Sequence, residues 1–571
     1  PASSFSIENG GIFDPGSKVF TFASGSFIIN TGGVVSGFGP SAGTMQSQNN
    51  VNFIFRNGST FNSAIKVNTG TLTAYNDQSP FVAVFSGTIT VDAGATLTQS
   101  NGGYTTQAMN TVTNNGTITS PSGANLFRMR GSNFVNNSSV SCQNLSFDST
   151  TSIVGTGTYT GQNISIGSSG NVSLSNNVTF SISSNFTVNG GGVLNPNTRT
   201  LTFGAGSFIV NTGGTVSNSG IFQTQGSVSV LSQNGASFNA PFKVNSGNTL
   251  AWNNQSPFLA VFNGTMTVDA GATFTLQNGG YTLQANNTLT NNGTITGPST
   301  LRIKGSSLIN SNLISCSGLT FDTTTNVSGA GSFTSSLITI GASGNISLGS
   351  NVTFTPSNNF NVVSGGTLNP NTFTFTISGT LYFNSGSTVS NSGIFRTQGS
   401  TSLICRGGSN FSAPLKINTG TTNVYDDGFP YIGVLNGTVT VDAGATMTCP
   451  NGGYTIRANN NVTNNGTISA PGSPAFRMYG TNFTNNGSIN FPAFYFETGA
   501  HTLSGTGSWL TNANVLSGST VTLGSNHKMA SIIVNGGGTF NVFTYMLSLS
   551  SSNPISNSGT FNTTTGTVEY N

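Results

Sequence analysis

Apolar and polar residues alternate along the whole chain in short runs that are separated by small polar turns. A typical stretch, residues 207–217, reads Ser-Phe-Ile-Val-Asn, then Thr-Gly-Gly, then Thr-Val-Ser. A period of two predicts short β-strands with one buried face. Gly-Gly and Asn-Gly turns supply the positive φ angles that tight corners need. No helical periodicity of useful length is present, so the pattern predicts an all-β protein.

The strands and turns recur in a rhythm of about 18–21 residues. Strands at such spacing form either a string of antiparallel sandwiches or a parallel coil. The small corners, and Asn and Thr residues that recur at those corners and can stack in ladders, favour the coil. The sequence therefore predicts an elongated parallel β-solenoid (a β-helix) of about 29 coils. Because crossovers between parallel strands are nearly always right-handed, we expect a right-handed coil.

A longer unit is written three times along the chain. Val-Asp-Ala-Gly-Ala-Thr begins at Val91, Val268 and Val441, and each copy is followed by Asn-Gly-Gly-Tyr and then by Asn-Asn-Gly-Thr-Ile. Copied units of this kind predict an array in which each unit contacts its neighbours. We expect one continuous solenoid with these divisions: 1–22, the end of a preceding unit; 23–203, 204–377 and 378–550, three units; and 551–571, the start of a further unit.

Composition narrows the class of partner. Charged residues are 5% of the chain and the net charge is +3, with no basic cluster, which gives no footprint for nucleic acid. No apolar run reaches the length of a membrane span. Hydrophobic residues, 35% of the chain, are enough to build a core. The four Cys residues do not form a disulfide framework, although a bridge between Cys405 and Cys449 remains open.

The few charges recur between the copies. Twelve of the 27 charged residues fall into four sets of three. One interpretation is that they solvate a face or cap corners; the other is that they form a track for lateral packing or ligand contact. The sets are Lys66, Lys243 and Lys416; Asp92, Asp269 and Asp442; Arg128, Arg302 and Arg477; and Asp148, Asp322 and Glu497.

We find no constellation that predicts catalysis. The acidic pair Asp426-Asp427 becomes Asn253-Asn254 in the middle copy, which is more typical of a turn than of a paired-carboxylate site. His501 and His527 both lie in the last unit, and we expect both at the surface. The sequence predicts no enzyme, no catalytic residue, no cofactor and no metal site.

One aromatic residue per copy is a candidate for glycan contact. Tyr75, Trp252 and Tyr425 hold the same position, ahead of an Asn/Asp pair and an X-Pro-aromatic sequence. Aromatic side chains beside polar loop residues suit weak, repeated stacking on sugar rings. The alternative is that each ring packs beneath its own loop.

Several phrases resemble a known group of proteins. Asn-Gly-Thr-Ile-Thr, Gly-Ala-Thr-Leu-Thr and the closing Gly-Thr-Val-Glu-Tyr-Asn at 566–571 are similar to those of the giant repetitive surface adhesins of Bacteroidota, such as the SprB-like gliding-motility proteins exported by type IX secretion. The resemblance implies a cell-surface filament and O-glycosylation after Asp, at Ser149 and Thr323. The third copy, Glu497-Thr498-Gly499, departs from that pattern.

These observations together predict an extracellular structural or adhesive filament segment on a bacterial outer surface. We expect weak, multivalent contact with surfaces or polysaccharides, and self-association into filaments. A glycan-binding adhesin module with one weak site per repeat is the main alternative. A β-helix polysaccharide-degrading enzyme is a distant one.

Overall fold

The computed structural model describes residues 4–37, 43–100, 102–121, 123–217, 220–277, 279–390, 393–450 and 452–571. Every regular element in these ranges is a β-strand, and the strands pair in parallel to form a β-solenoid of about 26 turns. The predicted fold class is confirmed. The handedness stays a prediction.

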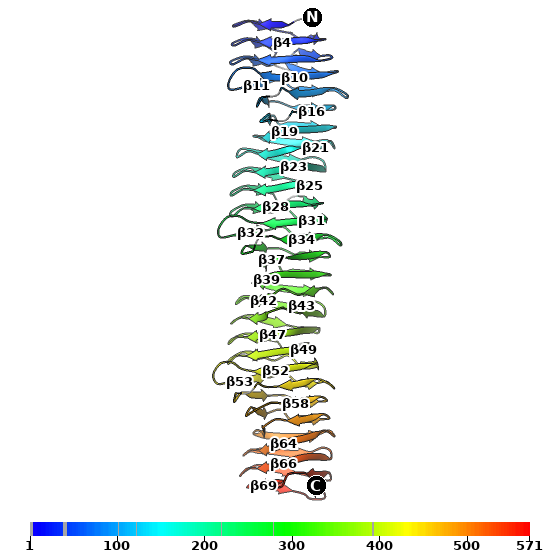
Figure 1. Cartoon of the computed structure of the whole chain (residues 1–571), viewed down its shortest axis with the longest axis vertical. Helices are drawn as coiled ribbons and strands as arrows, with labels where there is room; N and C mark the ends of the chain where they lie inside the picture. The colour runs from blue at the N-terminus through cyan, green and yellow to red at the C-terminus, as the bar shows by residue number, and fades with distance from the viewer. Residues whose placement is uncertain are drawn as a thin grey trace. The chain divides into compact units, whose positions relative to one another are not determined.

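The chain forms two compact units. Unit 1 comprises Pro1–Asn287 and Asn292–Ser299, and unit 2 comprises Thr288–Asn291 and Thr300–Asn571. In each unit, successive turns stack one upon the next (Figure 1). The division between the two units falls inside the predicted repeat 204–377. The proposed repeat boundaries stay a prediction.

Each turn contributes one strand to each of three faces. In unit 1, for example, each strand of one turn pairs in register with its counterpart in the next, such as Leu72 with Leu97 and Ile89 with Val112. Strand alternation places one face of every strand in the core. Three consecutive strands of each face in this region are β10 (Thr71–Asn76), β13 (Thr96–Gln99) and β16 (Thr117–Thr119); β11 (Val82–Phe85), β14 (Thr105–Ala108) and β17 (Leu126–Met129); and β12 (Ile89–Val91), β15 (Val112–Asn114) and β18 (Asn133–Asn136).

The turns are longer and fewer than the sequence rhythm predicts. Leu126 pairs in register with Asn144, which makes a short turn, whereas Gly25 pairs with Val51, which makes a much longer one. Turns that carry an outward loop or a wide corner use more of the chain for the same rise. The prediction of about 29 coils is therefore wrong in count, and about 26 turns are present.

Aromatic rings fill much of the core. In unit 1 Phe208, Phe222, Phe238 and Phe262 come from successive parts of the coil and all are buried. Their ring centroids are 4.4 Å apart for the first pair, 5.3 Å for the second and 4.8 Å for the third. Burial of one such side chain contributes about 1.5–3 kcal/mol. Stacking buries the rings of each turn beneath those of the next, whereas an isolated turn would leave its rings exposed to solvent.

The corners carry the predicted asparagine ladder. Asn114 Nδ2 donates to Asn136 Oδ1 at 2.8 Å, and Asn136 Nδ2 donates to the Thr158 carbonyl oxygen at 3.1 Å. Both Asn residues are fully buried. The Asn-Asn-Gly-Thr-Ile motif supplies this ladder in every copy, since Asn291 bonds to Asn310 and Asn464 to Asn485, each at 2.8 Å.

The glycine of the same motif lets consecutive turns approach. A Cβ atom on Gly116 would lie 2.3 Å from the carbonyl oxygens of Asp92 and Ala95 in the preceding turn. Gly293 and Gly466 meet the homologous oxygens at 2.3–2.4 Å. Only glycine fits at these three corners without a shift of the backbone.

The repeat unit does not contain a whole number of turns. From Tyr75 on β10, parallel pairing leads through eight steps to β30 (Phe242–Ser246). The residue homologous to Tyr75, however, is Trp252 on the following strand, β31 (Asn248–Trp252). One repeat therefore spans eight turns and about one third of a ninth.

Candidate functional site: three aromatic-tipped loops

One loop per repeat copy extends outward from the coil (Figure 1). Loop 1 (residues 76–81) joins β10 to β11, loop 2 (residues 253–258) joins β31 to β32 (Leu259–Phe262), and loop 3 (residues 426–431) joins β52 (Thr421–Tyr425) to β53 (Ile432–Leu435). Each contains a cis X-Pro peptide bond followed directly by an aromatic residue.

The aromatic residue after each proline is held outward. Phe81, Phe258 and Tyr431 have φ angles of 60°, 57° and 61°, and their exposed fractions are 40%, 43% and 43%. A bulky residue rarely adopts a positive φ unless its surroundings impose it. Loop 3 adds Phe429, which is 87% exposed. We call these four residues the tip aromatics.

A buried side chain closes the base of each loop. Asn76 Oδ1 accepts from the Gln78 backbone N–H at 2.9 Å, and its Nδ2 donates to the Val82 carbonyl oxygen at 2.9 Å. Asn253 makes the same two hydrogen bonds in loop 2, to Gln255 and Leu259, both at 2.8 Å. Both Asn side chains are almost fully buried.

Loop 3 has a carboxylate where the other loops have this amide. Asp426 is fully buried, and its Oδ1 accepts from the Gly428 backbone N–H at 2.9 Å. Its Oδ2 has no hydrogen-bond partner. Burial raises the pKa of this carboxyl, although the nearby Gly407 and Gly428 backbone N–H groups offset part of the rise.

A second interaction ties each loop to the preceding turn. In loop 1, Arg56 Nη2 lies 3.1 Å from Asp77 Oδ2. In loop 3, Arg406 binds Asp427 through Nε at 2.7 Å and Nη2 at 2.9 Å. The guanidinium of Arg406 lowers the pKa of Asp427. In loop 2 the homologous residues are uncharged, and Gln233 Nε2 donates to Asn254 Oδ1 at 3.5 Å.

The three aromatic residues that the sequence singled out support the loops from below. Tyr75 and Tyr425 are half-buried, with ring centroids 5.5 Å and 5.4 Å from Tyr104 and Tyr454. Trp252 Nε1 donates to Ser229 Oγ at 2.7 Å. Burial raises the pKa of both tyrosine hydroxyls, Tyr75 and Tyr425. Glycan contact at Tyr75, Trp252 and Tyr425 stays a prediction.

The tip aromatics were not singled out by the sequence reasoning. An aromatic residue directly after X-Pro is the signal that marks three of them, at Phe81, Phe258 and Tyr431. The polar run before each X-Pro marks a loop, but the sequence pattern does not show that the ring after the proline is held outward at a positive φ.

Loop 2 borders a small pocket of ≈ 240 Å³. Carboxamides, aromatic rings and glycine backbone line it. Tyr281 is 3% exposed and donates its hydroxyl to the Ala251 carbonyl oxygen. The lining residues are Asn253, Asn254, Phe258, Gly279, Gly280 and Tyr281. Asn278, with Asn101 and Asn451 of the same motif, lies outside the described residues.

Loops 1 and 2, both in unit 1, project from the same side of the coil (Figure 1). Their supporting residues are eight and one third turns apart, which at about 4.8 Å per strand spacing is about 40 Å. Loop 1 and loop 2 leave different faces of the coil and yet project from the same side. The faces must therefore rotate about the long axis of the coil by about one third of a revolution over that distance. About 15° per turn is enough, which is within the ordinary twist between neighbouring strands.

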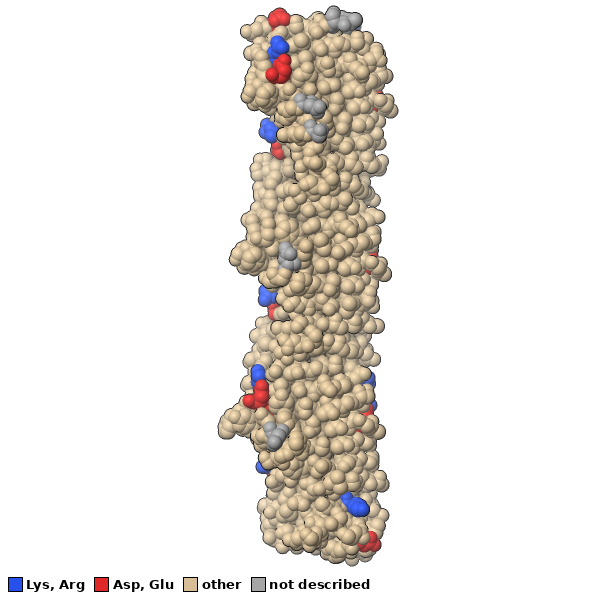
Figure 2. Space-filling view, viewed as in Figure 1, with Lys and Arg blue, Asp and Glu red and all other residues tan. Residues whose placement is uncertain are grey.

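The recurring charges are partners of one another. Lys66, Lys243 and Lys416 each reach an Asp of the next turn at 2.9, 2.8 and 3.2 Å. The recurring Arg residues bind the recurring acids likewise: Arg128 with Asp148 at 3.0 Å, Arg302 with Asp322 at 2.9 Å, and Arg477 with Glu497. Figure 2 shows charged side chains in a few small groups on an otherwise uncharged face. These pairs neutralise one another's charge, and both interpretations of the recurring charges stay predictions.

The predicted glycosylation residues lie beside these ion pairs. Ser149 Oγ donates to the Arg130 carbonyl oxygen at 2.6 Å, and Thr323 Oγ1 donates to the Lys304 carbonyl oxygen at 2.9 Å. Both residues are partly exposed. Their modification stays a prediction.

The two histidines are buried, and the expectation of surface positions is wrong. His501 is 2% exposed, and its ring nitrogens lie 2.7 Å and 2.6 Å from the carbonyl oxygens of Gly480 and Glu497. His527 is 4% exposed, and burial lowers its pKa. Both histidines belong to strands rather than to polar turns, His501 to β63 (Gly499–Ser504) and His527 to β66 (His527–Val534).

All four cysteines are free and buried, so the Cys405–Cys449 bridge is not formed. Burial raises the pKa of each thiol to about 12, which keeps it protonated and unreactive at neutral pH. Cys142 and Cys316 share their repeat position with Phe491, and all three are core residues. In the described part of the chain, no cluster of three or more His, Cys, Asp or Glu residues could hold a metal ion.

No family model matches the chain, and none of the curated proteins or solved structures compared with it is significantly similar. The likeness to Bacteroidota adhesins therefore stays a prediction. Among the described residues, no helix has the length and apolarity needed to span a membrane.

Proposed function

We propose that this chain is a structural and adhesive segment of an extracellular filament on a bacterial surface, in which a β-solenoid presents aromatic-tipped loops at regular intervals. The observation that carries the proposal is the loop itself. Three copies keep an outward aromatic residue at positive φ above a closed base, although the surrounding sequence varies.

The construction suits contact with an external surface. An exposed aromatic side chain offers a large apolar area with few torsions to immobilise. The base of each loop is fixed by the buried Asn or Asp residue and by the interaction with the preceding turn. Little conformational entropy is therefore lost on binding. The solenoid core supplies the fixed spacing.

Repetition converts weak contacts into firm attachment. Loops 1 and 2 face one way about 40 Å apart, so both can touch the same surface. Each further contact is then intramolecular, and the overall strength rises without any change in the single site.

The test compares adhesion of loop variants. The intact chain, coupled to beads, is expected to adhere to polysaccharide-coated or apolar surfaces under flow. Replacing Phe81, Phe258, Phe429 and Tyr431 together by Ser should reduce the retained fraction by roughly tenfold or more, and single replacements should reduce it much less.

Phe543 provides a matched control. It also has a positive φ, 53°, and is 46% exposed, but it lies outside the loops. Phe543→Ser should leave adhesion unchanged. If the fourfold loop variant adheres as the intact chain does, or if Phe543→Ser weakens adhesion equally, the proposed role of the loops is wrong.

A glycan-binding module is the second candidate, and the pocket beside loop 2 favours it. The carboxamide of Asn254 offers a donor and an acceptor to hydroxyl groups, and Phe258 offers a ring face. A glycan array bound by the intact chain, with binding lost in Asn254→Ala and Phe258→Ala but kept in Phe543→Ser, would support this candidate.

A further inference from the structure

A second kind of site lies away from the loops, where long strands bend between two faces. Two hollows occur at such bends, one of ≈ 380 Å³ in unit 1 and one of ≈ 360 Å³ in unit 2. We propose that each hollow is part of a groove that binds an extended, neutral polysaccharide chain across successive turns.

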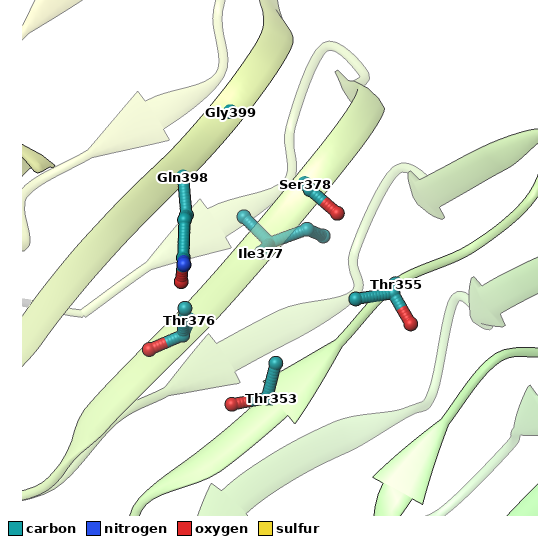
Figure 3. Close-up of a pocket in the computed structure, with 7 residues that line it drawn as sticks. All are labelled: Thr353, Thr355, Thr376, Ile377, Ser378, Gln398 and Gly399. Carbon is teal, nitrogen blue, oxygen red and sulfur yellow. The ribbon is translucent and has the colours of Figure 1, made fainter. Parts of the chain in front are cut away.

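The hollow in unit 2 spans three consecutive strands. Figure 3 shows Thr353, Thr376 and Gln398 in a row, with Ser378 and Thr355 on the other side of Ile377. The three strands are β44 (Val352–Phe354), β47 (Thr374–Phe383) and β49 (Ile394–Cys405). Thr353 pairs in register with Thr376, and the register between β47 and β49 shifts between Ile377 and Gly379. This shift marks the bulge beside the hollow.

The hollow in unit 1 spans four turns. Ser141, Thr160 and Ser181 pair in register on three of these turns, and Ser120 precedes them on the fourth. A register shift between Gly161 and Asn163 again lies at the bend. The strands are β19 (Ser139–Phe147), β21 (Thr158–Ile166) and β23 (Val178–Val188), and the lining residues are Ser120, Ser141, Cys142, Gln143, Thr160, Gly161, Gln162, Ser181 and Ser183.

The two hollows occupy adjoining places in the repeat. Val178-Thr179-Phe180-Ser181 at the end of the first hollow is homologous to Val352-Thr353-Phe354-Thr355 at the start of the second. The bend therefore recurs in adjoining parts of the unit. Ser181 and its homologue Thr355 both keep a hydroxyl group, whereas the homologues of Ser120 and Ser378 are Gly297 and Gly204.

The lining determines the class of ligand. Hydroxyl and carboxamide groups both donate and accept hydrogen bonds, which matches the hydroxyl groups of a sugar. Threonine methyl groups add small apolar patches. No charged residue lines either hollow. Arg396, the register partner of Thr376, lies on the next strand but not in the lining. A neutral glycan fits this lining better than an acidic one.

The direction of the groove favours a chain rather than a single sugar. In unit 1, Ser141, Thr160 and Ser181 present hydroxyl groups at each strand spacing, about 4.8 Å, which is the scale on which sugar units repeat in an extended polysaccharide. In unit 2, Thr353 and Thr376 do so on two strands, and Arg396 follows them in register. Each turn then contributes one weak contact, and the contacts add along the chain. A monosaccharide would use only one of them.

The test uses substitutions that fill the groove from outside. Ser181 and Thr353 are exposed on strands, so Ser181→Arg with Thr353→Arg should keep the fold while blocking both hollows. Thr150→Arg with Thr324→Arg is the matched control, since these threonines are also exposed, also on strands and homologous to each other. Circular dichroism and thermal melting of the intact chain verify that both variants fold.

Affinity electrophoresis in gels that contain laminarin, dextran or yeast mannan measures binding. The intact chain should be retarded by at least one of these neutral polysaccharides, the Ser181→Arg/Thr353→Arg variant should lose roughly tenfold in affinity, and the control should not. Retardation only by alginate or chondroitin sulfate, no retardation by any of them, or equal retardation of the blocked variant would overturn the proposal.

The same gels separate this site from the loops. The loop variant with Phe81, Phe258, Phe429 and Tyr431 replaced by Ser should be retarded as strongly as the intact chain. If the loop variant alone loses retardation, glycan binding belongs to the loops and the groove proposal is wrong.

Discussion

Arg406 holds Asp427 with two nearly parallel hydrogen bonds, Nε to Oδ1 at 2.7 Å and Nη2 to Oδ2 at 2.9 Å. The same guanidinium lies over the ring of Tyr382, 4.9 Å from its centroid, and donates to Asn384 at 2.6 Å. It thus links three successive turns beneath the most aromatic of the three loops. In loop 2 the homologous residues, Gln233 and Asn254, form only a hydrogen bond between uncharged amides.

Replacing this ion pair with the amides of loop 2 should loosen loop 3. In Arg406→Gln with Asp427→Asn, amide hydrogen exchange within residues 428–431 should accelerate by roughly threefold to fivefold, the size expected of an exposed but bidentate pair of about 1 kcal/mol. Exchange in loop 2 of the same molecule is the internal control. Addition of salt at about 1 M to the intact chain should act on loops 1 and 3 and spare loop 2.

Loop 3 should also respond to pH through Asp426. Burial raises its pKa above the ordinary value of 3.8, so the folded loop binds the proton more tightly than the unfolded chain does. The stabilisation is complete below the ordinary value and is lost as pH rises through the folded value. Protection of the Gly428 and Tyr431 amides, corrected for intrinsic exchange, should therefore fall from acid to neutral pH.

Asp426→Asn should abolish that response and stabilise loop 3 at neutral pH by about 1–3 kcal/mol, because the amide restores a donor where Oδ2 has no partner. The reciprocal change, Asn253→Asp, should create the response in loop 2. A pH-independent loop 3 in the intact chain would contradict the assignment.

The buried asparagine ladder should contribute more to the stability of the coil than the exposed asparagine next to it. Asn114→Ala removes the bond to Asn136 inside the corner and should destabilise unit 1 by about 1–3 kcal/mol. Asn115 accepts a hydrogen bond from Asn137 on the outside, so Asn115→Ala should cost less than about 0.5 kcal/mol. Exchange of the core amides of β15 and β18 measures both, and equal costs would show that burial does not matter here.

The corner glycine should tolerate no side chain. Gly116→Ala places a Cβ atom 2.3 Å from two backbone oxygens and should destabilise the coil by about 1–3 kcal/mol or more. Gly94 differs, because it has a φ of 78° and no atom within 4 Å. Gly94→Asn should therefore be mild, since Asn tolerates the left-handed region. Thermal melting distinguishes the two variants.

The fold class could be predicted from the sequence because the geometry of a solenoid depends on local sequence patterns that recur in every turn. Alternation at period two, small corners and recurring Asn and Thr predicted the strands, their parallel stacking and polar ladders at the corners, of which Asn114 and Asn136 form one. The number of turns was less accessible. A short turn and a long one have the same rise, and only the register, such as that of Gly25 with Val51, shows which corners are wide.

The site was only partly predictable. Tyr75, Trp252 and Tyr425 were found through repeat position, but their half-burial depends on Tyr104, Ser229 and Tyr454, which lie in other turns of the coil and are distant in sequence. The outward direction of Phe81 follows from a backbone angle that period-two reasoning cannot supply. The burial of His501 depends on carbonyl oxygens of Gly480 and Glu497 that face its ring.

The fractional number of turns per repeat carries a consequence for how such a gene can change. Recombination between copies adds or removes eight and one third turns at once, and the accompanying twist returns each new loop to the side of its predecessor. An insertion that is one third of a turn too long or too short would instead move every later loop to a different face from those before it. The length of the unit thus keeps successive loops on one side of the coil, which favours gain or loss of entire copies over growth by smaller pieces.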